Sequence, residues 1–253
     1  MYPAEVEHIE SMLKLPTHIV GVKFFSSAEA LPKKPLAHPH NFCQLVSIAR
    51  YQEMSNVWTA DKAVCAIGAA CLGLIRTPEI FSAGKAPTGR YTKNHDAGKK
   101  FVANVFKLGD GDTLYSGVFA HSLRKMDEAD VAVIYGMPAQ IMRLIHAFVY
   151  DSGEKVTGDT VCEAALCSAV AFAFKNRKPL FAIPCAGDRR FGGTQHTEMI
   201  FALPVDEFKR MYENLVATEK LGASVFPVAP FAFYEPKMSE SYTMKSEYLG
   251  ENR

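Results

Sequence analysis

The amino-acid sequence predicts an α/β fold, with a mixed α+β arrangement as a possible variant, in which two similar halves pack as one globular body. The first observation behind this prediction is a cysteine spacing that occurs twice. Cys43 and Cys65 lie 22 residues apart, and Cys162 and Cys185 lie 23 residues apart. The second observation is that each pair encloses a helix-like segment, then a strand-like segment that leads to a glycine-bearing stretch. Such a fold could bring four thiols to one pseudo-twofold axis.

A third observation is a strand-like segment ahead of each cysteine pair. VGVKFF at 20–25 has a loose counterpart in VAVIYG at 131–136. Because helix, strand and glycine turn recur in many unrelated α/β proteins, this repeat alone does not establish a duplication. We place the first half at 1–125, the second half at 126–234 and a polar tail at 235–253.

The elements of the first half follow from apolar periodicity. Residues 5–15 form a predicted helix because Val6, Ile9 and Met12 recur on one face, and Pro16 ends it. A strand is expected at 19–25. A proline-rich loop then leads to the helix that begins at Cys43, and a β-leaning segment carries the chain on to Cys65.

The second half shows the same alternation. A helix is expected from Pro138, which suits the first helical turn, to Tyr150. Another follows Cys162, and the apolar run at 179–184 reads as a buried strand. The last expected elements are a strand at 197–204 and a helix from Asp206 that Gly222 ends.

Composition narrows the class of protein. The formal net charge of +1, with 22% charged residues, gives no electrostatic footprint for nucleic acid. The start of the chain is acidic and amphipathic rather than a secretory signal, and no apolar run reaches the roughly 18 to 20 residues of a membrane span. We therefore expect a cytoplasmic protein with no nucleic-acid or membrane partner. The sequence leaves open whether the protein forms a homo-oligomer.

In the cytoplasm, six cysteines are expected to be thiols, metal ligands or redox groups rather than structural disulfides. Four thiolates suit an iron–sulfur cluster, most simply a [4Fe–4S] cluster, and the chain lacks the tight knuckles of ordinary zinc sites. The candidate ligands are Cys43, Cys65, Cys162 and Cys185. The alternatives are inert core cysteines and a reactive thiol at Cys185; Cys71 and Cys167 are expected to be small core residues.

The segment after Cys185 predicts an anion-binding turn. A glycine-rich turn behind a buried strand exposes backbone N–H groups, and two arginines add cationic forks. A small anionic molecule would fit this turn, whereas a purely structural turn would pair Asp188 with one arginine. The candidate binding residues are Gly187, Arg189, Arg190, Gly192 and Gly193.

Histidine pairs form weaker candidates. His196 and Glu198 would share one face if they lay in a strand, and His38 and His40 flank the first cysteine helix in a proline loop. A solvated loop is the simpler interpretation of the basic stretch that contains Arg90. No GxSxG motif points to a serine hydrolase.

Several segments resemble one known family. FCQLVSIAR, CAIGAACLGL, VCEAALCSAVAFAF and above all PCAGDRRFGGTQHTEMIFALP resemble domain of unknown function family 169 of archaea and bacteria. The resemblance extends from about Glu5 to about Pro230, and its most specific part is Pro-Cys-Ala-Gly-Asp-Arg. It implies a shared fold, but it brings no agreed biochemical role.

Two hypotheses follow. The first is an iron–sulfur, or other thiolate-ligated metal, protein with the cluster at the junction of the halves. It would be a redox protein, or a Lewis-acid enzyme of lyase or desulfurase type acting on a small anionic substrate if one iron stayed open. The second is a cluster-free protein that binds a small molecule at the glycine–arginine turn. Whether the chain is an enzyme is left open.

Overall fold

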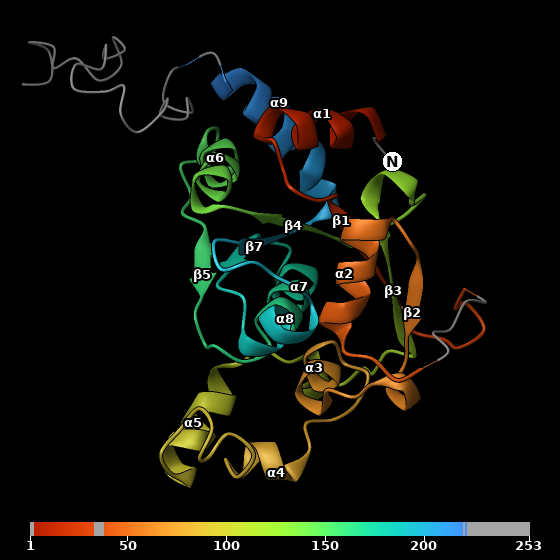
Figure 1. Ribbon diagram of the computed structural model, residues 1–253, viewed down its shortest axis with the longest axis vertical. Coiled ribbons are helices and arrows are strands. Elements are labelled where there is room, and N and C mark those ends of the chain that lie inside the picture. Colours follow the sequence, from red (N-terminus) through yellow and green to blue (C-terminus); the bar gives the residue numbers. More distant parts are fainter. Residues whose placement is uncertain (1–2, 33–37, 220, 222–253) are drawn as a thin grey trace, which may run out of the picture.

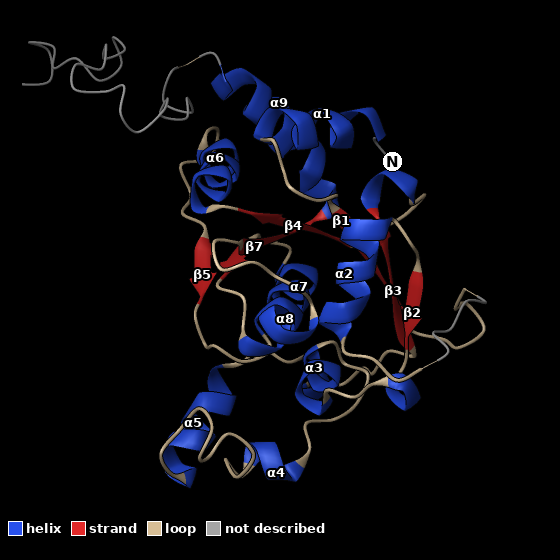
Figure 2. Cartoon of the chain, viewed as in Figure 1, coloured by secondary structure: helices blue, strands red, loops and turns tan. Residues whose placement is uncertain are grey.

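The computed structural model describes residues 3–32, 38–219 and 221. These form one seven-stranded sheet in the order β2-β3-β1-β4-β7-β6-β5, covered by helices on both faces (Figures 1 and 2). All neighbouring strands are antiparallel except β5 and β6. The prediction of a mixed α/β fold is confirmed, whereas the predicted tail and the cap at Gly222 lie outside the described residues.

The strands are β1 (Val20–Phe25), β2 (Asn56–Trp58), β3 (Gly117–Ser122), β4 (Val131–Gly136), β5 (Thr157–Asp159), β6 (Leu180–Ala182) and β7 (Met199–Pro204). The α-helices are α1 (Pro3–Leu13), α2 (Phe42–Gln52), α3 (Ala66–Cys71), α4 (Glu79–Ser82), α5 (His95–Asn104), α6 (Pro138–Val149), α7 (Ala165–Asn176), α8 (Ala186–Phe191) and α9 (Phe208–Glu219). In the described chain, no helix is both long and apolar enough to cross a bilayer.

The sheet lies between two helical layers. Successive residues of a strand point to opposite faces, and β4 shows this alternation clearly. Val131, Val133 and Tyr135 belong to the core beneath α2 and α7, while Ala132 and Ile134 belong to the core beneath α1, α6 and α9. Figure 1 shows α2, α3, α7 and α8 together on one side of the sheet. This face carries the cysteines.

The strands on either side of the central pair, β1 and β4, follow matching orders. Outward from β1 come β3 and β2, and outward from β4 come β7 and β6. The chain order is also similar: β1-α2-β2-α3-β3 corresponds to β4-α7-β6-α8-β7, with α6 and β5 inserted after β4 and with α4 and α5 inserted before β3. Moreover, α2 contacts α8 and α7 contacts α3, so each half packs a helix on the other. Two matching halves would produce this arrangement, while their origin by duplication stays a prediction.

Some local predictions are confirmed and others are wrong. The helix predicted from Pro138 is α6, with the proline in its first turn. The β-leaning segment before Cys65 is a strand only at β2 and continues as a 3₁₀ turn at Ala60–Lys62. The glycine-rich turn predicted after Cys185 is wrong at its start, where Ala186–Phe191 form the short helix α8, while the helix-like stretch after Cys65 contains the short helix α3.

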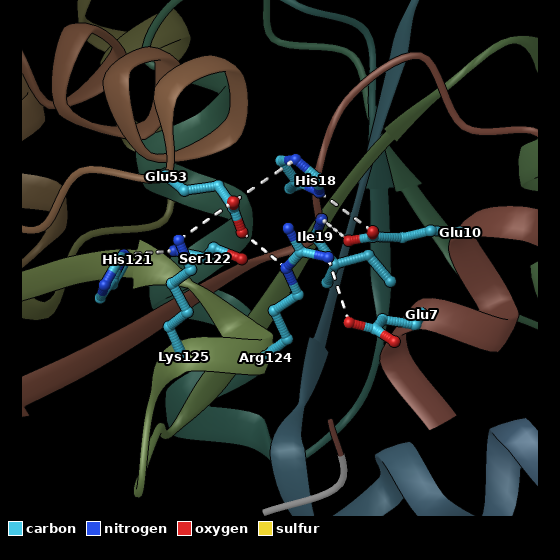
Figure 3. Close-up of polar contacts among 9 residues, drawn as sticks. All are labelled: Glu7, Glu10, His18, Ile19, Glu53, His121, Ser122, Arg124 and Lys125. Carbon is cyan, nitrogen blue, oxygen red and sulfur yellow. Dashed lines mark hydrogen bonds and ion pairs between the residues drawn. The ribbon is translucent and has the colours of Figure 1, made fainter. Parts of the chain in front are cut away.

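An ion-pair network fixes the end of α2 (Figure 3). Glu53 follows the helix with φ 52°, a left-handed conformation that non-glycine residues seldom adopt. Its carboxylate accepts from Arg124 Nε at 2.6 Å and lies 3.0 Å from Lys125 Nζ, while Arg124 also reaches Glu7 at 3.2 Å. The Arg124 hydrogen bond, opposed by partial burial, lowers the pKa of Glu53 to about 2. The network ties α1 and α2 to the turn that follows β3.

Candidate functional site

Four cysteines lie at the starts of α2, α3, α7 and α8, and α2 contacts α8 and α7 while α3 contacts α7. Cys43 is the second residue of α2, and Cys167 is the third residue of α7. Cys65 and Cys185 are the N-cap residues of α3 and α8. The α2–α8 and α3–α7 contacts therefore bring together thiols that are distant in the sequence.

The spacing around Gly68 in α3 shows how close two of the sulfurs lie. A Cβ atom on Gly68 would be 3.1 Å from Cys167 Sγ and 3.3 Å from Cys65 Sγ. A side chain on Gly68 would have to displace one of the two sulfurs by a few tenths of an ångström. Cys65 and Cys167 are therefore neighbours although they belong to different halves.

Cys43 and Cys185 also come from different halves of the chain. The Cys43 thiol donates to the carbonyl of Gly187 in α8 at 3.6 Å. Glycine is also needed at 192, where α8 ends against α2, because a Cβ atom there would lie 2.8 Å from the Asp188 carbonyl oxygen and 3.2 Å from Cys43 Cβ. Cys43 and Cys185 interact electrostatically, as do Cys43 and Cys65.

Burial keeps these thiols protonated at neutral pH. It raises the pKa of Cys185 to about 11, with a further increase from Asp188, and it raises the pKa of Cys43 and Cys65. The pKa of the buried Cys167 lies well above the usual range for the same reason. A metal cation would reverse this balance by stabilising the thiolates, so binding it would release protons.

Asp188 connects the starts of α7 and α8 through hydrogen bonds. The residue is 1% exposed, and its carboxylate accepts from the backbone N–H groups of Cys185, at 3.1 Å, and Leu166. These bonds cap α8 and the start of α7 with one side chain. Burial raises the pKa of Asp188. Its hydrogen bonds thus differ from the arginine pairing that a structural turn was expected to show.

The surroundings of Cys162 differ from those of Cys43, Cys65, Cys167 and Cys185. It is exposed, has φ 68° and donates to the carbonyl of Thr160 at 3.3 Å. The place in α7 that matches Cys43 in α2 is taken by Cys167, five residues further on. Cys167 is buried in the core, as expected from the sequence, and it also lies beside Cys65.

The predicted anion-binding residues occupy a helix and the turn behind it. Arg189 donates to the carbonyl of Gln195 at 2.6 Å, and Arg190 lies over the Phe191 ring at 5.6 Å. Both arginines belong to the last turn of α8, whereas Cys185 is at its start. Gly193, with φ 65°, then reverses the chain.

The predicted pair of His196 and Glu198 is not formed as expected, because both precede β7 and only Glu198 is buried. Glu198 accepts instead from Arg50 Nη2 at 2.9 Å. The Arg50 guanidinium also stacks on Tyr135, 3.8 Å from the ring centroid. The other histidine pair lies beside α2, where the carbonyl of His40 accepts from the Trp58 indole at 2.9 Å.

A preformed metal site is not present in the described residues, where no three His, Cys, Asp or Glu side chains are arranged to hold an ion. The site is therefore a group of neighbouring protonated thiols. Its metal-binding form would require the sulfurs to lose their protons and draw together.

Comparison with known proteins places the chain in a family. The model of domain of unknown function family 169, described as "Uncharacterised ArCR", matches residues 8–214. The chain is 28% identical over 214 residues to "Uncharacterized protein MJ0308" of Methanocaldococcus jannaschii, which covers 81% of this chain and 89% of that protein. No solved structure matches. Because the family model extends over most of the chain, the protein belongs to domain of unknown function family 169.

Proposed function

We propose that this protein binds a thiolate-ligated metal centre, most simply a [4Fe–4S] cluster, at the junction of its two halves. The observation that carries the proposal is the convergence of Cys43, Cys65, Cys167 and Cys185 from four separate segments. Core packing alone gives no reason for thiols at matching helix starts of both halves. A reducing cytoplasm would keep them available.

The donor set fits a soft metal. Thiolate sulfur selects zinc, cuprous copper and iron–sulfur clusters, and dispersed ligands at an interface suit a cluster better than the tight knuckles of zinc sites. Cys167 replaces Cys162 in the proposed set because Cys167 lies beside Cys65. When bound, the centre would supply electron transfer or, with one iron open to a ligand, Lewis-acid chemistry.

The surrounding residues would position this centre. Asp188 joins the starts of α7 and α8 and so fixes Cys185 relative to Cys167. Gly68 and Gly192 leave the space in which thiols of opposite halves approach. Removing the glycine at 68 would therefore affect metal binding through the spacing of the sulfurs, without removing a ligand.

The test is anaerobic purification with an absorption spectrum and assays for iron and acid-labile sulfide. A broad absorption band at about 400 nm, with iron and sulfide in matching amounts, is expected for a cluster. Cys185→Ala should abolish it. The matched pair Cys167→Ser and Cys162→Ser separates the two ligand sets, since the first should lose the band and the second should keep it.

Circular dichroism establishes that each variant folds. A folded, colourless protein that takes up neither iron nor another soft metal during anaerobic reconstitution would exclude the proposal. Loss of the band in Cys162→Ser but not in Cys167→Ser would instead restore the ligand set predicted from spacing.

A further inference from the structure

The outward face of helix α6 carries no Asp, Glu, Lys or Arg. Residues three and four positions apart share one face of a helix. In α6 and its C-cap, the residues of this face are exposed or half-buried: Pro138, Ala139, Met142, Ile145, His146, Val149 and Tyr150. Met142 is 44% exposed and Tyr150 is 47% exposed. The charged residue of the helix, Arg143, points inward and is buried.

The two other helices of this layer differ from α6. Helix α9 exposes Lys209, Glu213 and Glu219, and α1 exposes Glu7. Figure 1 shows α6 at the margin of the layer. A helix that is apolar on all sides is normally covered on all sides, because water gains little from contact with an apolar surface. We therefore expect a further segment of protein to cover the outward face of α6.

Two ion pairs fix the direction of α9 relative to α6. Arg210, in the first turn of α9, donates to Asp151, which follows α6, at 2.6 Å. Arg143, in the first half of α6, donates to Glu219, the last residue of α9, at 2.6 Å. The two helices are therefore antiparallel, and the chain leaves α9 beside the first half of α6. Leu221, at this end of the described residues, is 46% exposed.

The sequence after Leu221 is apolar over a defined length. Residues 223–234 read ASVFPVAPFAFY and include no charged residue, and charged residues return at Glu235. Apolar and aromatic side chains of this kind favour burial over contact with water. Twelve residues can span about 40 Å when extended, whereas a helix as long as α6 measures about 18 Å. The segment is therefore long enough to follow the whole outward face from the point where α9 ends.

We propose that residues 223–234 dock on the outward face of α6 of the same chain, with aromatic side chains packed on Met142 and Tyr150. Both partners are apolar, so docking removes apolar area from water. Because the segment is joined to α9, it meets the face at a high effective concentration, whereas a second copy of the chain would lose translational and rotational freedom on binding.

Pro227 and Pro230 add to this preference. Their fixed φ reduces the number of conformations of the free segment, which lowers the entropy lost when the segment is ordered. The docking surface lies on the face of the sheet opposite the cysteines, because α6 contributes Ile141 and Leu144 to the other core. The inference is therefore independent of metal binding.

Photo-crosslinking of the full-length protein tests the contact directly. The replacement Met142→p-benzoylphenylalanine places a photoreactive side chain at the centre of the face. After irradiation and digestion with trypsin, mass spectrometry should find this residue joined to the tryptic peptide 221–237 within a covalent monomer. The same replacement at Ser11, an exposed residue of α1, is the control and should give no such product. Crosslinked dimers would assign the face to a second copy, and the absence of a crosslink to 221–237 would likewise overturn the inference.

Chymotrypsin measures how strongly the segment is held. Cleavage after Phe231 should be at least about tenfold faster in Met142→Glu than in wild type, because a charge on the face weakens docking and an undocked segment is open to the protease. Cleavage after Tyr242, outside the segment, should not change. Met142→Leu should behave as wild type, and Ser11→Glu is the matched control that adds the same charge to α1.

Circular dichroism establishes that each variant folds. Equal rates of cleavage after Phe231 in wild type, Met142→Glu and Ser11→Glu would overturn the inference.

Discussion

The buried ion pair of Arg50 and Glu198 gives the strongest stability prediction. The side chains are 1% and 3% exposed, and their N–O distance is 2.9 Å. Replacement Arg50→Met leaves the Glu198 carboxylate buried with only the backbone N–H of Gln195 as a donor, at 2.7 Å. Removing one partner of a buried pair costs about 3–5 kcal/mol of unfolding free energy. For a chain of this size, each kcal/mol lowers Tm by about 2–4 °C, so a decrease of about 6–20 °C is expected.

Urea unfolding followed by circular dichroism measures this cost. The double variant Arg50→Met/Glu198→Leu should be more stable than Arg50→Met alone, because it leaves no unpaired charge in the core. Glu213→Gln is the control, since it removes the exposed ion pair with Lys209 and should change stability by less than about 1 kcal/mol. Arg50→Met within about 0.5 kcal/mol of wild type, or strict additivity in the double variant, would refute the reasoning.

Three further predictions concern other parts of the fold. Glu53 has a folded pKa of about 2 against 4.5 unperturbed, so Glu53→Gln should lower the unfolding free energy at pH 7, with a difference that shrinks as pH falls from 4.5 toward 2 in acid urea melts. Alkylation with iodoacetamide, read by mass spectrometry, should label exposed Cys162 first and fully buried Cys71 last; equal rates would contradict the assigned burial. Gly98→Ala should cost about 1–3 kcal/mol and speed amide exchange in α5, whereas exposed Lys100→Ala should not.

The sequence was sufficient to predict the elements with strong periodicity. α1, β1, α6 and α7 appear where apolar spacing or a proline indicated them. The three-residue strand β5 gave no signal, because Thr157–Asp159 has no buried alternating face. The short helix α8 was also hidden, since its glycine resembles that of a turn.

The site was harder to predict because it depends on where helices start. Spacing pointed to Cys162, but left-handed residues at 162 and 164 delay α7 until residue 165 and bring Cys167 into the group. The partner of Glu198 was also out of reach, because Arg50 lies 148 residues away in the sequence. Tertiary contacts of this kind leave no local pattern.

Helix α2 of the first half packs on α8 of the second, and α7 of the second half packs on α3 of the first. The four cysteines therefore lie where the two halves contact each other. Cys65 and Cys167 are neighbours from opposite halves, and Cys43 donates to the carbonyl of Gly187 in the other half, so a motion that separates the halves would also separate these residues. By linkage, a group that binds only the assembled sulfurs would stabilise the contact between the halves, and the stabilisation would grow with the free concentration of that group. Loss of the bound group and parting of the halves would then be one event, recorded as a single transition.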